Sequence, residues 1–154
     1  MWYRGTHLKS IFFVLAVMLT TLFALPPVAE ASLKIEVVDD IDRLQEYKWN
    51  NRLVLILLNG NPAKEIDAII SAYSDESDEL EDRQIVFILL ENKKVKSELV
   101  KIYKKRYKKN MNGPYVIIGL DGEIKRTRKK LFTPKRLYKF VDSMPMRKSS
   151  QAKK

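Results

Sequence analysis

The sequence predicts an α/β fold, a single domain with a mixed central sheet flanked by helices in the order β-α-β-α-β-β-α. Two observations lead to this prediction. Residues 52–58 and 84–90, which read RLVLILL and QIVFILL, are continuous apolar runs typical of strands buried on both faces. Between them, residues 66–73 carry apolar side chains at spacings of three and four, which indicates a helix joining two parallel strands.

Local signals predict the other elements of the first half. Residues 33–38 read as a strand, and residues 39–47 as a short helix whose acidic first turn suits the helix dipole. Asn61-Pro62 predicts the start of the next helix, with asparagine as the N-cap and proline at the first helical position. The acidic stretch at residues 75–82 is expected to follow that helix at its exit.

The second half begins with a basic helix predicted over residues 93–108. Residues 114–120 read as a third strand, and the Asp121-Gly122 turn leads into a hairpin partner at residues 123–128. Thr133-Pro134 then starts the last helix. The polar tail at residues 148–154 is predicted to be disordered, so the folded domain is expected at residues 32–147.

The first 31 residues read as a signal peptide. A short basic start with Arg4 and Lys9 leads into an apolar run that is shorter than the roughly 18 residues of a spanning helix. Small residues at Ala29 and Ala31 predict cleavage before Ser32, and the protein is expected to be exported, to the periplasm or out of the cell. A retained membrane anchor is the alternative interpretation.

The composition excludes several kinds of catalysis in the exported chain. The sequence has no cysteine, and its one histidine, His7, lies in the predicted signal peptide. Thiol redox chemistry, Cys/His zinc sites and Ser-His-Asp triads each need a residue that is then missing. The net charge of the whole sequence is +10, and such an excess favours anionic partners through its long-range field.

Four short motifs together resemble a known family. They read YKWNNR at residues 47–52, LEDRQ at 80–84, IGLDGEIK at 118–125 and DSMPMR at 142–147. The individual positions that follow the family pattern are Trp49, Arg52, Asp82, Arg83, Asp121, Gly122, Asp142, Met144, Pro145, Met146 and Arg147. In this order the motifs resemble the domain of unknown function 4174, which occurs in small exported bacterial proteins and in animal matrix proteins of the sushi-repeat-containing and coiled-coil-domain-80 type.

The resemblance implies a thioredoxin-like fold, an extracytoplasmic location and, in the animal relatives, roles in the matrix or in adhesion, and it supplies no catalytic residue. In redox-active thioredoxin-like proteins the cysteine pair follows the first central strand, at the place of residues 59–62 here, where no sulfur is present. Pro114 stands where such folds usually keep a cis proline, so a cis Gly113–Pro114 bond is expected. The segment from Asp142 to Arg147 is expected to anchor the last helix, and Trp49 to pack at a strand entrance.

Basic residues are crowded on the predicted helix at residues 93–109, where nine lysines and arginines face a single Glu98. An apolar stripe through Val95, Leu99, Ile102 and Tyr103 is expected to leave the lysines outside. With a second cluster after the hairpin turn, the predicted anion-binding residues are Lys94, Lys101, Lys104, Lys105, Lys108, Lys125, Arg126, Arg128, Lys129 and Lys130. If both clusters face the same way, they form one surface for an anionic glycan, a lipid head group or an extracellular polyanion; ordinary solvation is the alternative.

Two other functions remain open from the sequence. The acidic groups at residues 39–42 and 75–82 suggest a carboxylate-dependent hydrolase, although both places favour acids for electrostatic reasons alone. A protein-binding accessory factor of the cell envelope would use its sheet edge or the face around residues 59–62. No metal site and no cofactor are predicted.

Overall fold

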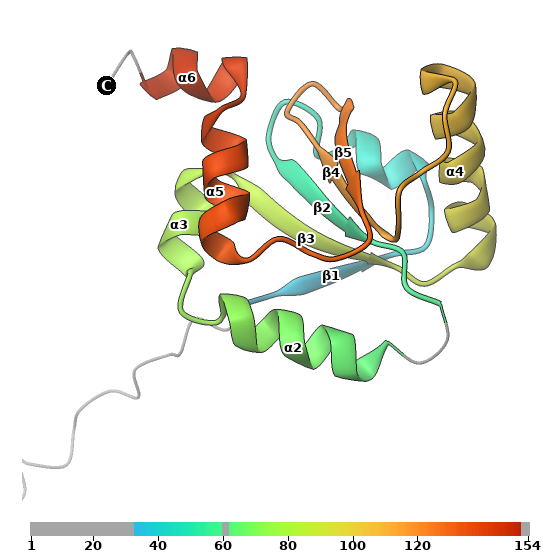
Figure 1. Ribbon diagram of the computed structural model, residues 1–154, viewed down its shortest axis with the longest axis horizontal. Coiled ribbons are helices and arrows are strands. Elements are labelled where there is room, and N and C mark those ends of the chain that lie inside the picture. The colour runs from blue at the N-terminus through green and yellow to red at the C-terminus, as the bar shows by residue number, and fades with distance from the viewer. Residues whose placement is uncertain (1–32, 60–61, 152–154) are drawn as a thin grey trace, which may run out of the picture. The chain divides into compact units, whose positions relative to one another are not determined.

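Five strands form one mixed sheet in the order β1-β3-β2-β4-β5 (Figure 1). The computed structural model describes residues 33–59 and 62–151, so the predicted signal peptide and its cleavage site lie outside the described residues. The strands are β1 (Ile35–Val38), β2 (Arg52–Ile56), β3 (Ile85–Leu90), β4 (Tyr115–Ile118) and β5 (Ile124–Arg128). The helices are η2 (Asp42–Gln45), α2 (Ala63–Tyr73), α3 (Ser77–Asp82), α4 (Lys93–Tyr107), α5 (Pro134–Asp142) and α6 (Pro145–Gln151).

The pairing of the strands confirms the predicted mixed sheet. β1 and β2 both run parallel to β3, whereas β4 pairs antiparallel with β2 and with β5. The central strand β2 is buried along its whole length, as its continuous apolar sequence predicts. The turn around Asp121-Gly122 joins β4 to β5 as expected, with an irregularity in the ladder at Ile117/Ile118.

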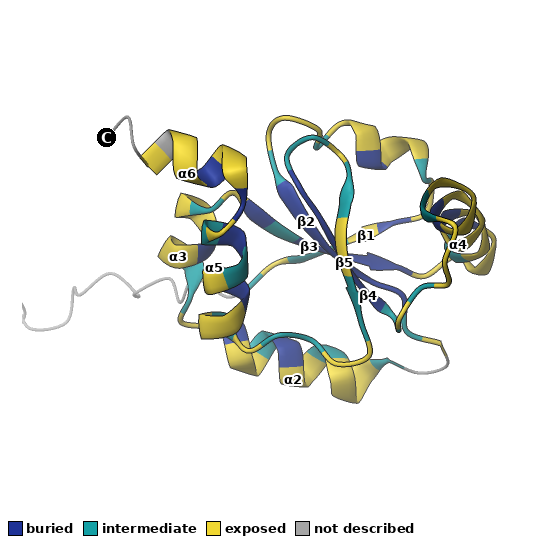
Figure 2. Cartoon of the chain, turned by 45° about the horizontal axis from the view of Figure 1, so that its top comes forward, coloured by how far each residue is buried: buried dark blue, intermediate teal, exposed yellow. Residues whose placement is uncertain are grey.

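Two apolar cores cover the two faces of the sheet. One core joins Phe87 of β3 to Tyr73 of α2 and Leu137 of α5, and the other joins Leu55 of β2 to Leu99 of α4. Figure 2 shows the buried strands between α2, α3 and α5 on one side and α4 on the other. Because each face has its own core, α4 packs on one face of the sheet and takes no part in the core on the α5 side.

Three local predictions differ from the structure. The helix α2 begins at Ala63 with Pro62 as its cap residue, so proline is not the first helical residue, and Asn61 lies outside the described residues. The predicted helix at residues 39–47 is only the 3-10 helix η2. The acidic stretch forms the separate helix α3, because Leu80 turns inward and packs in the core that also holds Tyr73.

Two predictions about the backbone are wrong. The described residues contain no cis peptide bond, so the Gly113–Pro114 bond is trans. The chain turns into β4 at Gly113 instead, whose φ of +101° is a conformation that glycine adopts without strain. Residues 148–151 belong to α6 and are helical, because Arg147 is buried and the backbone N–H groups of Arg147 and Lys148 both donate to the carbonyl of Met144.

Candidate functional site

The basic helix α4 packs on the sheet through one apolar strip of side chains. Val95, Leu99 and Tyr103 are buried at spacings of four. Asn92 caps the helix by accepting a hydrogen bond from the backbone N–H of Lys94 at 2.8 Å. At the other end Lys108 takes a left-handed conformation and stops the helix.

The outer face of α4 carries unpaired positive charge. All five predicted lysines of this helix segment are exposed, and within the described residues none of them forms an ion pair. They are Lys94, Lys101, Lys104, Lys105 and Lys108. The expected apolar stripe is narrower than predicted, because Ile102 is 45% exposed. Arg106 on the same helix is paired, with Glu123 across the surface.

A groove of about 880 Å³ opens between α4, the end of β2 and the loop that leads into β4. Its walls combine lysines with apolar side chains: Lys93, Lys96, Lys101, Leu58, Val100, Met111 and Pro114 are among the lining residues. Lys96 donates from Nζ to the carbonyl oxygen of Leu58, which fixes one wall of the groove. Lys101 therefore belongs both to the exposed face and to this groove.

A second, more polar groove of about 490 Å³ lies between the end of α4 and β5. Tyr103, Tyr107 and Lys109 line it from the α4 side, and Lys125 and Arg126 line it from β5. This groove brings the first two residues of the second predicted cluster next to α4.

Arg126 lines this groove, but its guanidinium and that of Arg128 lie over aromatic rings on the α5 side of the sheet. The guanidinium of Arg126 lies 4.9 Å from the ring of Phe140, and that of Arg128 lies 4.1 Å from the ring of Phe132. Both rings pack against the core on the α5 side of the sheet. Lys129 and Lys130 follow β5 and are exposed. The structure thus divides the ten predicted residues between two sides and does not gather them on one surface.

The arginine–carboxylate cluster is a group of motif residues that the fold brings together from far apart in the chain; it consists of Asp82, Arg83, Asp142 and Arg147. Arg83 donates from Nε and Nη2 to the two oxygens of Asp142, at 3.0 and 2.9 Å. Arg147 donates to Asp142 at 3.3 Å and to the carbonyl of Asp82 at 2.7 Å. The contacts join α6 to the end of α3 and to α5; that the segment anchors the last helix to the sheet stays a prediction.

Electrostatics reinforces the arginine–carboxylate cluster. Burial alone would lower the pKa of Arg83, but hydrogen bonds to Asp142 and Glu79 outweigh it, so the pKa of Arg83 is raised. The guanidinium also lies 4.7 Å from the ring of Tyr138, a cation–π distance. Burial is the main cause that raises the pKa of Tyr138.

The remaining motif residues surround the β4–β5 turn. Trp49 is 60% exposed and has a φ of +70°, so the expectation that it packs is wrong. Its backbone N–H donates to the carbonyl of Leu120 at 2.7 Å. The ammonium of Lys48 lies 5.5 Å from the centre of the indole ring, and the methylenes of Lys48 lie where a Cβ at Gly122 would point.

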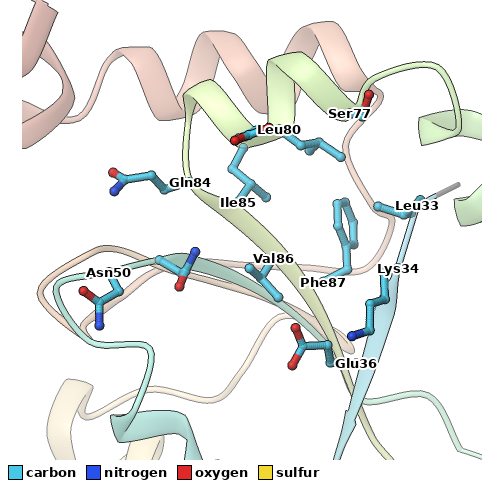
Figure 3. Close-up of a pocket in the computed structure, with 12 residues that line it drawn as sticks. Leu33, Lys34, Glu36, Asn50, Ser77, Leu80, Gln84, Ile85, Val86 and Phe87 are labelled. Carbon is cyan, nitrogen blue, oxygen red and sulfur yellow. The ribbon is translucent and has the colours of Figure 1, made fainter. Parts of the chain in front are cut away.

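A further pocket of about 610 Å³ was not predicted from the sequence (Figure 3). Its side chains come from β1, β3, α3 and the loop before β2, and they include Glu36, Asn50 and Gln84. Glu36 accepts a hydrogen bond at 2.6 Å from the hydroxyl of Tyr47. Burial and this hydrogen bond raise the pKa of Tyr47 to about 12.

Residues 33–59 and 62–151 contain neither a candidate metal-binding cluster nor a helix that could span a membrane. These residues hold no group of three or more histidine, cysteine, aspartate and glutamate side chains placed to bind a metal ion. No helix in the same ranges is long and apolar enough to cross a bilayer.

Fold and site together define a small α/β protein with a basic helix on one face of its sheet and an arginine–carboxylate cluster on the other. The chain belongs to the family described as "Domain of unknown function (DUF4174)", whose model matches residues 43–150. Comparisons with curated proteins and with solved structures give no match.

Proposed function

We propose that this protein is an exported binding module that takes anionic partners on the outer face of α4 and in the groove beside it. The observation that supports this most is the row of five exposed lysines on α4 that form no ion pair within the described residues. Like charges one helical turn apart repel by about 0.2–0.5 kcal/mol per pair. Lys101 and Lys105 form such a pair, and Lys104 and Lys108 another. A bound polyanion would relieve this repulsion.

The groove beside α4 supports the same proposal. Three lysines, Lys93, Lys96 and Lys101, line it together with exposed apolar groups such as Val100. This mixture suits an anion that carries apolar parts, such as a lipid head group with its neighbouring chains or a substituted glycan. An extracellular polyanion without apolar parts would use the outer lysines alone.

Protein binding is the second candidate function, and one observation favours it. The groove contains Asn59 and Pro114, the neighbourhood in which redox-active thioredoxin-like proteins hold their cysteines. The strand order β1-β3-β2-β4-β5 supports a thioredoxin-like relationship that has lost this chemistry, whereas the trans Gly113–Pro114 bond departs from that pattern. An accessory factor of the cell envelope would bind a partner protein at this face.

A carboxylate-dependent hydrolase is less well supported. Asp82 and Asp142 are both engaged by arginine side chains, and Glu79 by Arg83. These contacts give Glu79, Asp82 and Asp142 a structural role, so a hydrolase would have to use other acids of residues 39–42 and 75–82.

The test is retention on a heparin-type polyanion matrix across a salt gradient. The variant carries the reversals Lys101→Glu, Lys104→Glu, Lys105→Glu and Lys108→Glu. The matched control carries the reversals Lys64→Glu, Lys135→Glu, Arg136→Glu and Lys139→Glu, four exposed residues on α2 and α5. Both variants change the net charge equally, so a difference between them reports the position of the charge.

We expect late, salt-sensitive elution of the wild type and of the control, and early elution of the α4 variant, because contacts with a polyanion weaken with ionic strength. Equal early shifts of both variants would mean that only the net charge matters. Early elution of all three proteins would contradict polyanion binding and direct the search to protein partners at the groove.

A further inference from the structure

Arg126 and Arg128 stand on the same face of β5, the strand at one edge of the sheet. They are two positions apart in the strand, and side chains at that spacing point to the same side. Their partners in β4 are Ile117 and Tyr115, which both belong to the core on the α5 side. Both arginines therefore lie on the α5 face of the sheet, opposite the face that carries α4.

Each of the two guanidinium groups lies over an aromatic ring. The guanidinium of Arg126 is 4.9 Å from the ring centre of Phe140, and that of Arg128 is 4.1 Å from the ring centre of Phe132. The centres of these two rings are 5.7 Å apart. A guanidinium that stacks on a ring keeps the N–H groups at its edge available for a ligand. The ring pair thus holds the two guanidinium groups as neighbours at the surface.

Neither guanidinium is neutralised by a carboxylate. Within the described residues no ion pair includes Arg126 or Arg128. Arg128 donates from Nε to the carbonyl oxygen of Lys130 at 3.2 Å, so its two Nη groups are left for another acceptor. Burial, and next the charge of Glu65, raise the pKa of Tyr115 beside Arg128, yet Glu65 pairs with neither arginine.

A phosphomonoester matches this arrangement better than a carboxylate does. Such a group carries about −1.5 to −2 charges at pH 7 and three acceptor oxygens, so it can bind two guanidinium groups at once. A carboxylate has one charge and two oxygens, which a single arginine can satisfy. The exposed Lys129 and Lys130, which follow β5, add to the positive potential of this edge.

We propose that Arg126 and Arg128 bind a phosphomonoester group between them, with Phe140 and Phe132 as the rings that position the two guanidinium groups. This site goes beyond the proposed function, because it lies on the other face of the sheet and uses none of the lysines of α4. The phosphoryl group belongs either to a free phosphate ester or to a lipid head group.

The test titrates the full-length chain with methyl phosphate, and with sodium acetate at the same ionic strength as the control anion. Binding is followed by the ³¹P resonance of methyl phosphate and by the ¹H–¹⁵N resonances of the arginine Nε–H groups. We expect methyl phosphate to shift the resonances of Arg126 and Arg128, and acetate to shift them much less. The α4 variant should keep both shifts, so failure of this site and failure of the proposed function can be told apart.

A substitution that conserves charge shows whether the guanidinium groups matter. Arg126→Lys with Arg128→Lys should weaken the binding of methyl phosphate about tenfold or more, because lysine lacks the paired N–H groups. The matched control is Arg43→Lys with Arg136→Lys, which changes two exposed arginines elsewhere and should not weaken binding. Phe140→Leu keeps both arginines but removes the ring under Arg126, so it should also weaken binding. All three are made in the α4 variant, so that the lysines of α4 add no binding of their own.

Vesicles separate the two sources of the phosphoryl group. Vesicles of phosphatidylcholine alone are compared with vesicles that also contain phosphatidic acid, whose head group is a phosphomonoester. Binding of the α4 variant to phosphatidic acid that is lost on Arg126→Lys with Arg128→Lys assigns the site to a lipid head group. Binding of methyl phosphate without binding to vesicles assigns it to a free ester. The proposal is overturned if methyl phosphate shifts neither arginine resonance, or if the two lysine substitutions leave its affinity unchanged.

Discussion

Replacing Asp142 by asparagine tests whether the arginine–carboxylate cluster anchors α6. Asparagine keeps the shape of the side chain but removes its charge and turns one acceptor into a donor. Asp142 accepts hydrogen bonds from Arg83 at 2.9 and 3.0 Å and from Arg147 at 3.3 Å. Asp142→Asn therefore removes the carboxylate that two mostly buried guanidinium groups share, while Glu79 and Asp82 remain as their other partners.

The size of the effect follows from burial. Removing one partner of a fully buried ion pair costs about 3–5 kcal/mol, and an exposed pair contributes about 0–1 kcal/mol. The side chains of Arg83 and Arg147 are 12% and 8% exposed, and that of Asp142 is 30% exposed. The expected loss in the free energy of unfolding lies between these limits, at about 2–3 kcal/mol, or roughly 8–12 °C in Tm.

The assay is urea unfolding followed by circular dichroism, together with limited proteolysis of α6. The matched control is Glu123→Gln, which breaks the Arg106–Glu123 ion pair. The side chains of Arg106 and Glu123 are 57% and 44% exposed. The free energy of unfolding of the control should fall by less than about 1 kcal/mol. The anchoring argument is refuted if Asp142→Asn and Glu123→Gln lower the free energy of unfolding by the same amount and α6 is cleaved no faster in Asp142→Asn than in the wild type.

Two further predictions concern pH and export. The pKa of Tyr47 is raised to about 12 in the folded protein, above its ordinary value, so the neutral phenol contributes stability that is lost as pH rises from about 10 to about 12. In urea unfolding, the free energy of unfolding of the wild type should fall more over this pH range than that of Tyr47→Phe. If the two free energies fall in parallel with pH, the role of the Glu36 contact is contradicted. The protein recovered outside the cytoplasm should have a mass that begins at Ser32; recovery of the uncleaved chain would contradict the signal peptide.

Most of the sheet could be predicted because its signals are local. The runs at residues 52–58 and 84–90 are apolar after their first residue, and the structure places them at the central strands β2 and β3. The basic helix was also predicted to within a residue of its observed end at Tyr107. In each case a short stretch of sequence favours one backbone conformation, and the burial of its side chains in the fold favours the same conformation.

The errors occur where distant contacts decide the conformation. Residues 148–151 are polar and read as a tail, but α6 forms because Arg147 binds Asp82, which is 65 residues away in the sequence. A tryptophan at a strand entrance usually packs, yet Trp49 is 60% exposed, and its backbone N–H is bound to the distant Leu120. The pocket of Figure 3 had no local signal either, because four separate segments line it.

The sequence by itself determined the class of fold, the absence of thiol chemistry and the concentration of lysines on one helix. These properties depend on composition and on spacing along the chain, which need no knowledge of distant contacts. Only the tertiary structure decided that the second basic cluster divides between two sides, and that Arg52 is buried against the carbonyl of Arg83 while Arg83 is neutralised by Asp142. The physical reason is that the burial and the partner of a charged side chain are set by elements that meet only when the sheet and its helices assemble.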